Sequence, residues 1–264
     1  MHAESWPSVR RVWRDHQRAL VTWSAALAAI AMFYMAFWPL MGEELAAAYE
    51  GIPEAVMRAI GYHQVTTAGG YMQSVVYGLL GPVLVIIYAV GLGGRILAGQ
   101  EEDGTLELDL ASPVSRGRLY WERFAAGWAL VTVLVAAVTV ALLVSGPLFG
   151  LGVDTRHVLT ASVGLLLLGG GFFSIAFAVG AATGRRGAAV GAGAMVATVT
   201  FVFRGVADAA GVDVLAALSP FSWLLGNEPL ENGLALWDAL RLAAITLIAA
   251  PLGVARFMRR DLMA

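Results

Sequence analysis

The chain alternates long apolar stretches with short segments that carry most of its charges. A helix needs about 20 mostly apolar residues to cross the hydrocarbon core of a bilayer. Four charge-free stretches clearly reach that length: Ala19–Leu40, Ser74–Gly94, Phe124–Ser145 and Val158–Ala182. Two weaker ones follow, Gly187–Phe203 and Leu234–Phe257, of which the last carries Asp238 and Arg241 at an i,i+3 spacing that lets them pair. The pattern predicts an all-α integral membrane protein with six transmembrane helices in a single domain over residues 1–264.

Composition favours lipid over water as the solvent of this chain. Of the 264 residues, 59% are hydrophobic and 14% are charged, which is too apolar for an ordinary soluble domain. The formal net charge of −2 provides no basic field for nucleic-acid binding. The sequence contains no cysteine and no lysine, which excludes disulfides, thiol chemistry and the P-loop lysine of ATP-binding proteins.

The basic residues fall mainly on one side of the predicted membrane. They cluster before span one, between spans two and three, between spans four and five, and after span six: Arg10, Arg11, Arg14, Arg18, Arg95, Arg116, Arg118, Arg123, Arg185, Arg186, Arg256, Arg259 and Arg260. The positive-inside rule therefore predicts that both termini are cytoplasmic. Apolar residues at helical spacing within Trp6–Arg18 favour an N-terminal interfacial helix on the membrane surface. A charged leader that only orients span one is the alternative.

The loop between spans two and three is the densest charge cluster of the chain. It runs from Gly94 to Arg116 as GRILAGQEEDGTLELDLASPVSR. A turn at Gly104 and a short acidic helix from about Thr105 to Ala111 fit this sequence, because Pro113 disfavours a helical residue ahead of it. Such a helix on the cytoplasmic side suits docking onto a partner, and a solvated charged loop is the alternative.

This loop resembles that of the type-2 ATP-binding-cassette (ABC) exporter permeases, six-span proteins that include bacterial antibiotic and multidrug exporters. The shared pattern is a glutamate-rich turn, Gly-Thr, a Leu-Glu-Leu run and Pro-Val-Ser-Arg. The resemblance implies that region 94–123, with its cytoplasmic coupling helix, contacts a separate ATPase subunit. The candidate partner-coupling residues are Glu101, Glu102, Gly104, Thr105, Leu106, Glu107, Pro113 and Arg116. ATP and Mg would be bound by that subunit, so this chain is expected to hold no cofactor or metal and to be no enzyme itself.

The resemblance also implies a second permease, either another copy of this chain or a related one. In the family the two permeases meet chiefly through spans one and five. The candidate interface residues are therefore Gly187, Gly191 and Gly193. Such an exporter would lie in the cytoplasmic (inner) cell membrane among its lipids and move an amphipathic small molecule or lipid outward.

Aromatic residues in the spans are candidates for the lining of a substrate cavity. Those considered are Phe33, Phe37, Phe172 and Phe173, although their rings could equally face lipid.

Two local features of the sequence lead to further structural predictions. Gly81-Pro82 inside span two predicts a kink, and the apolar stretch Val214–Leu225 either dips into the outer leaflet or forms a surface loop.

A self-sufficient secondary transporter or channel is the alternative function. No titratable residue lies in the middle of a span, which weakens proton-coupled transport. No paired catalytic side chains lie within the spans, which counts against an intramembrane enzyme. His63 and His157 each lack a second ligand at metal spacing.

Overall fold

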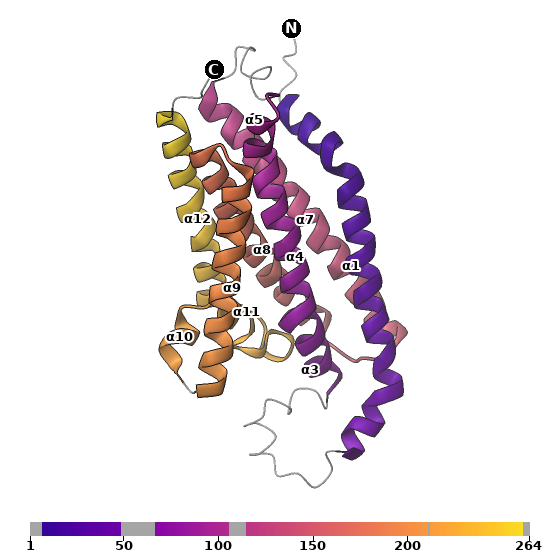
Figure 1. The fold of residues 1–264 in the computed structure, drawn as a ribbon. Helices are drawn as coiled ribbons and strands as arrows, with labels where there is room; N and C mark the ends of the chain where they lie inside the picture. Colours follow the sequence, from indigo (N-terminus) through magenta and orange to yellow (C-terminus); the bar gives the residue numbers. More distant parts are fainter. Residues whose placement is uncertain (1–6, 49–66, 106–114, 211, 261–264) are drawn as a thin grey trace.

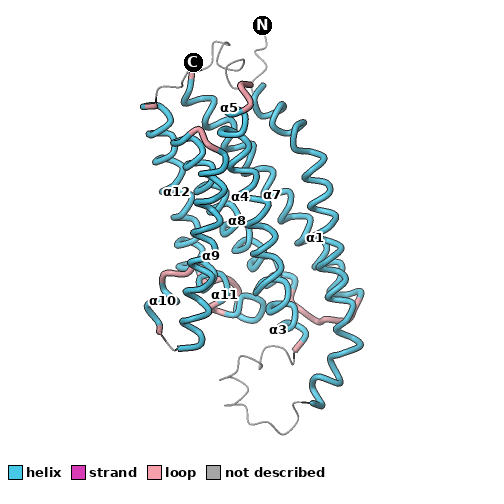
Figure 2. Tube along the Cα trace, in the orientation of Figure 1, coloured by secondary structure: helices cyan, strands magenta, loops and turns pink. Residues whose placement is uncertain are grey.

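The computed structural model describes residues 7–48, 67–105, 115–210 and 212–260, and nearly all of them are helical (Figures 1 and 2). No strand occurs in these ranges. The elements in chain order are α1 (Pro7–Ala48), α3 (Ala68–Met72), η2 (Gln73–Leu80), α4 (Gly81–Gly94), η3 (Arg95–Gly99), α5 (Gln100–Glu102), α7 (Arg116–Leu148), α8 (Thr155–Thr183), α9 (Arg186–Ala210), α10 (Asp213–Ala217), α11 (Pro220–Leu225), η4 (Glu228–Asn232) and α12 (Leu236–Arg259).

Six stretches among the described residues are long and apolar enough to cross a membrane, which confirms the all-α, six-span prediction. One of them, Ala68–Glu102, joins α3, η2, α4, η3 and α5 into a single rod. The others are α1, α7, α8, α9 and α12. The start of α1, the end of α12 and α5 lie at the same end of the bundle (Figure 1). This arrangement is what an even number of spans requires, while the side of the membrane on which that end lies stays a prediction.

Helix α8 is the central helix, and it packs against α4, α7, α9 and α12. Its glycines allow neighbouring side chains to approach its backbone closely. A Cβ added at Gly170 would lie 2.2 Å from Cζ2 of Trp128 on α7, and one at Gly169 would lie 2.5 Å from Cγ1 of Val85 on α4. Small residues at such contacts are typical of helices that associate within a bilayer.

Helix α1 is one continuous helix of 42 residues. Residues 7–18, predicted as a surface helix, are helical but continue into span one without a break. The physical reason is that residues 8–38 contain neither Gly nor Pro, so nothing in this segment interrupts helix propagation. Val12 and Leu20 are both buried against the bundle, and this contact anchors the N-terminal part of α1 to the core.

Span two changes helix type at Gly81-Pro82, while the kink expected there stays a prediction. Residues of η2 are π-helical, and the Gly81 N–H donates to the carbonyl of Val76, five residues earlier. A Cβ at Gly81 would lie 2.5 Å from that carbonyl oxygen, so the turn requires glycine. Pro82, which has no N–H to donate, sits in the first turn of α4.

The stretch Val214–Leu225 forms the greater part of two short helices, α10 and α11, and is therefore no irregular surface loop. Phe221 of α11 is buried at 2% exposure, and the helix packs against α8, α9 and α12. One hydrogen bond fastens this segment to α9, and a second fastens the following η4 to η2. Ser219 Oγ donates to the carbonyl of Thr200 at 2.7 Å, and the N–H of Leu230 donates to Oε1 of Gln73 at 3.1 Å.

Candidate functional site

The predicted coupling region is described up to Thr105 and again from Ser115. Most of the predicted helix Thr105–Ala111 therefore lies outside the described residues, as do the candidates Leu106, Glu107 and Pro113. The expected turn at Gly104 is present, with a φ of +68°. The N–H and Oγ1 of Thr105 both donate to the carbonyl of Gln100, at 2.9 and 3.2 Å, and close this turn.

Two of the candidate glutamates bind the ends of other helices rather than projecting freely. Glu101 forms an ion pair with Arg260 after α12, and these side chains are only 25% and 19% exposed. Nη1 of Arg116, the first residue of α7, donates to the carbonyl of Arg260 at 3.1 Å. Oε1 of Glu102 accepts a hydrogen bond of 2.9 Å from the N–H of Arg186 at the start of α9. We call these five residues the charged cluster, and it joins four helix ends.

Glu101, Glu102 and Arg116 were predicted as site residues from the sequence, but their partners were not. Arg186 and Arg260 served only as signals of orientation. The partners lie 84 and 159 positions away along the chain, and no local pattern connects residues at such separations. Their meeting follows only from the way α9 and α12 pack around α8.

A second set of charged residues lies in the first turns of α7, and two of them, Glu122 and Arg123, are buried. Arg118 Nε donates to Oε1 of Glu122 at 2.7 Å, and the Glu122 side chain is 2% exposed. Arg123 is buried, and its Nη1 donates to the carbonyl of Ile96 in η3 at 3.0 Å. A buried charge is costly unless it is paired or hydrogen-bonded. The Arg123 bond therefore holds α7 against the last turns of span two, while the Arg118–Glu122 pair lies within α7.

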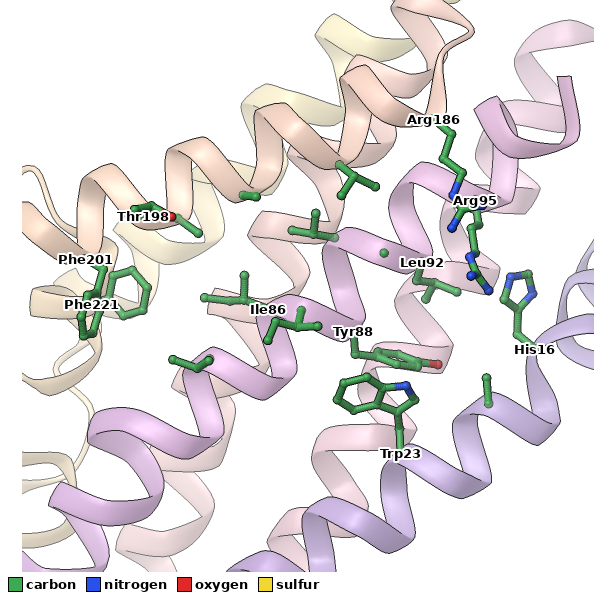
Figure 3. A pocket seen from close by; sticks show the side chains of 18 residues that line it. His16, Trp23, Ile86, Tyr88, Leu92, Arg95, Arg186, Thr198, Phe201 and Phe221 are labelled. Carbon is green, nitrogen blue, oxygen red and sulfur yellow. The ribbon is translucent and has the colours of Figure 1, made fainter. Parts of the chain in front are cut away.

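A cavity of about 590 Å³ opens on the side of the bundle between α1, α4 and α9, and α11 closes one end of it. Most of its wall is aliphatic or aromatic. The rings of Trp23 and Tyr88 pack 5.9 Å apart on one wall, and those of Phe201 and Phe221 pack 5.3 Å apart at the end near α11 (Figure 3). Its size and lining are those of a pocket for a drug-sized apolar molecule.

The phenylalanines considered as cavity lining do not line this cavity. Phe172 and Phe173 are fully buried, because they lie on the central helix α8 where neighbouring helices cover them on all sides. Phe33 and Phe37 on α1 are 59% and 36% exposed and are not among the residues around the cavity. Phe172 and Phe173 are therefore core residues, whereas the exposure of Phe33 and Phe37 agrees with the alternative that their rings face lipid.

The opposite end of the cavity is polar and lies beside the charged cluster. His16 of α1, Arg95 of η3 and Arg186 of α9 line this end (Figure 3). Arg186 belongs to both sites, because its backbone N–H binds Glu102 while its side chain lines the cavity. A movement of Glu102 would therefore be transmitted directly to the cavity wall.

Comparison with known protein families agrees with the six-helix membrane fold described above. Residues 6–262 match a family model described as ABC-2 family transporter protein. The chain belongs to this family. No curated protein matches it. The ABC-2 assignment and the six helices together identify a multi-pass membrane protein and the permease component of an ABC transporter. ABC-2 permeases normally work with an ATP-binding ATPase subunit.

The glycines predicted at the permease interface of this ABC-2 protein have different surroundings. Gly187 and Gly191 lie on an exposed face of α9, and a Cβ at either would meet nothing within 4 Å. Gly193 is packed inside the chain, where a Cβ would lie 2.8 Å from Cγ1 of Val90 on α4. Gly187 and Gly191 therefore remain accessible to a second ABC-2 chain, whereas Gly193 already serves the internal packing.

Within the described ranges, no group of three or more His, Asp or Glu side chains could hold a metal ion. The two features that stand out are the apolar cavity and the charged cluster at its polar end.

Proposed function

We propose that this chain is the membrane-spanning permease subunit of an ABC exporter that moves amphipathic molecules from the cytoplasmic side of the membrane outward. Its family supports the permease role. The lateral cavity supports an amphipathic substrate, because its wall is apolar while one end carries His16, Arg95 and Arg186. The observation that carries the proposal is the double role of Arg186, which links the cavity to the predicted coupling region.

In this proposal the ATPase subunit docks against region 94–123 and supplies all ATP and Mg binding. Closure of the ATPase displaces the end of span two. The charged cluster passes this displacement to α9 through Glu102 and Arg186, and to α12 through Glu101 and Arg260. Since Arg186 lines the cavity, the displacement changes the cavity at its polar end.

A second permease faces the open side of the cavity in the proposed assembly. Helices α1 and α9 border the cavity and have long exposed faces. Gly187 and Gly191 on α9 offer a surface without protruding side chains, which allows another helix to approach closely. The two cavities would then meet in a central path between the permeases.

The test of the docking site uses Asp103, which is exposed and whose side chain forms no hydrogen bond or ion pair among the described residues. An Asp103→Arg substitution therefore changes the outer surface without disturbing the charged cluster. Glu231→Arg is the matched control, because it also reverses an exposed acidic residue but lies in η4 at the opposite end of the bundle.

The tagged chain is purified in mild detergent, and the co-purifying proteins are identified. We expect a P-loop ATPase with the wild type and with Glu231→Arg, and a large loss of that ATPase with Asp103→Arg. If the chain purifies alone and still transports substrates in liposomes, it is a self-sufficient transporter or channel and the proposal is wrong.

A further inference from the structure

The polar end of the cavity carries positive charge that no carboxylate of the described chain neutralises. Arg95 and Arg186 line this end, both are exposed, and neither side chain forms an ion pair within the described ranges. Across the cavity, Nδ1–H of His16 donates to the carbonyl of Val12 at 2.9 Å. Its Nε2 is therefore the ring nitrogen that remains available to a ligand.

No Asp or Glu is among the described residues that line the cavity. Figure 3 shows the side chains of Arg95, Arg186 and His16 gathered at one end, while Phe201 and Phe221 lie at the other. The cavity is thus polarised along its length, with a cationic end and an apolar body. A bound molecule of matching charge would carry its negative group at the arginine end.

Tyr88 provides a second, independent indication of a ligand. It lines the same cavity at 6% exposure, and its hydroxyl has no hydrogen-bond partner among the described residues. A buried hydroxyl without a partner is destabilising. An oxygen atom of a bound molecule near the polar end would supply the missing acceptor.

We propose that the cavity binds a drug-sized anionic amphiphile, with a carboxylate, sulfate or phosphate between Arg95 and Arg186 and an apolar body along Trp23 and Phe201. The guanidinium groups suit such anions because their N–H donors match the oxygen pair. This inference rests on the proposed function, since it names the substrate class of the proposed transport path. The volume of about 590 Å³ lies within the range of pockets for drug-sized ligands, which favours such a molecule over a two-chain membrane lipid.

The binding test uses the full chain in phosphatidylcholine nanodiscs and two fluorescent probes. One is 11-(dansylamino)undecanoic acid, and the other is its uncharged methyl ester. We expect the acid to bind about tenfold more tightly than the ester, because only the acid forms charge-assisted hydrogen bonds. Arg95→Gln and Arg186→Gln should each remove most of this difference while leaving ester binding unchanged, which also shows that the variants are folded.

Arg185→Gln is the matched control, because Arg185 is the exposed neighbour of Arg186 and does not line the cavity. It should leave both dissociation constants as in the wild type. Equal binding of acid and ester by the wild type, or acid binding that neither cavity variant weakens, would overturn the proposal.

A second arm distinguishes the substrate from membrane lipid. When a tenth of the phosphatidylcholine is replaced by anionic phosphatidylglycerol, we expect the dissociation constant of the acid to stay the same. Displacement of the acid by this lipid would make the site a lipid site and overturn the proposal. Because the assay contains no ATPase, its outcome is independent of the co-purification that tests the proposed function.

Discussion

The ion pair between Glu101 and Arg260 should contribute measurably to the stability of the end of the bundle where α5 meets the end of α12. Both side chains are three-quarters or more buried, so solvent screens the pair less than it screens a pair on the surface. A hydrogen bond to a charged group contributes about 1.5–3 kcal/mol. We therefore expect Glu101→Gln and Arg260→Gln each to lower the free energy of unfolding by about 1–3 kcal/mol.

The pair is tested by a double-mutant cycle, with thermal unfolding of the full chain in detergent as the measurement. Once either partner is lost, loss of the other should cost much less, with an interaction energy of about 1–2 kcal/mol. The pair of Asp238 and Arg241, at 3.1 Å, serves as the control, because the Arg241 side chain is 55% exposed. A cycle on that pair should give about 0.5 kcal/mol or less.

The same variants should also affect coupling if the charged cluster transmits motion. In the complex with its ATPase, Glu101→Gln should retain ATP hydrolysis but lose most of the stimulation of hydrolysis by substrate. If the effects of Glu101→Gln and Arg260→Gln on stability simply add, and stimulation is unchanged, the cluster neither stabilises nor couples and this reasoning is refuted.

Three further predictions concern packing, assembly and topology. Gly170→Leu should lower the midpoint of thermal unfolding by several degrees, because the leucine side chain would overlap Trp128. An unchanged midpoint would contradict the packing described for α8. Since the chain has no cysteine, a Gly191→Cys variant should form a disulfide between two copies on oxidation, whereas Leu247→Cys, on the exposed face of α12, should not. With single cysteines in intact cells, an impermeant maleimide should label position 231 but not position 103, and the reverse result would invert the predicted topology.

Much of the fold could be predicted because its signals are local. Charge-free stretches of the right length identify helices that cross a bilayer, since the hydrocarbon core excludes unpaired backbone and charge. The i,i+3 spacing of Asp238 and Arg241 likewise predicted an ion pair that the structure contains. In both cases the residues that give the signal lie within one helix. The spacing of residues along a helix is known in advance, so the prediction needs no knowledge of how helices pack.

The site was less predictable because it depends on contacts between distant segments. Glu101 and Glu102 were identified from a family resemblance, but their partners Arg260 and Arg186 could not be, because helix packing brings them together. The aromatic residues around the cavity, such as Trp23 and Phe201, were not identified from the sequence for a related reason. Which face of a helix meets a neighbour depends on packing. Phe172 and Phe173 of α8 are covered by neighbouring helices, whereas α1 and α9 leave a space between them over α4.

The most direct test of the account is ATP-dependent uptake into inside-out membrane vesicles that contain the chain and its co-purifying ATPase. The dansylated undecanoic acid is the transported probe, and its uptake is followed with ATP, with a non-hydrolysable ATP analogue, and with ATP plus a protonophore. The account predicts uptake that requires ATP hydrolysis, resists the protonophore and is lost in Asp103→Arg vesicles. Uptake that proceeds without ATP and collapses with the protonophore would contradict it and identify a secondary transporter.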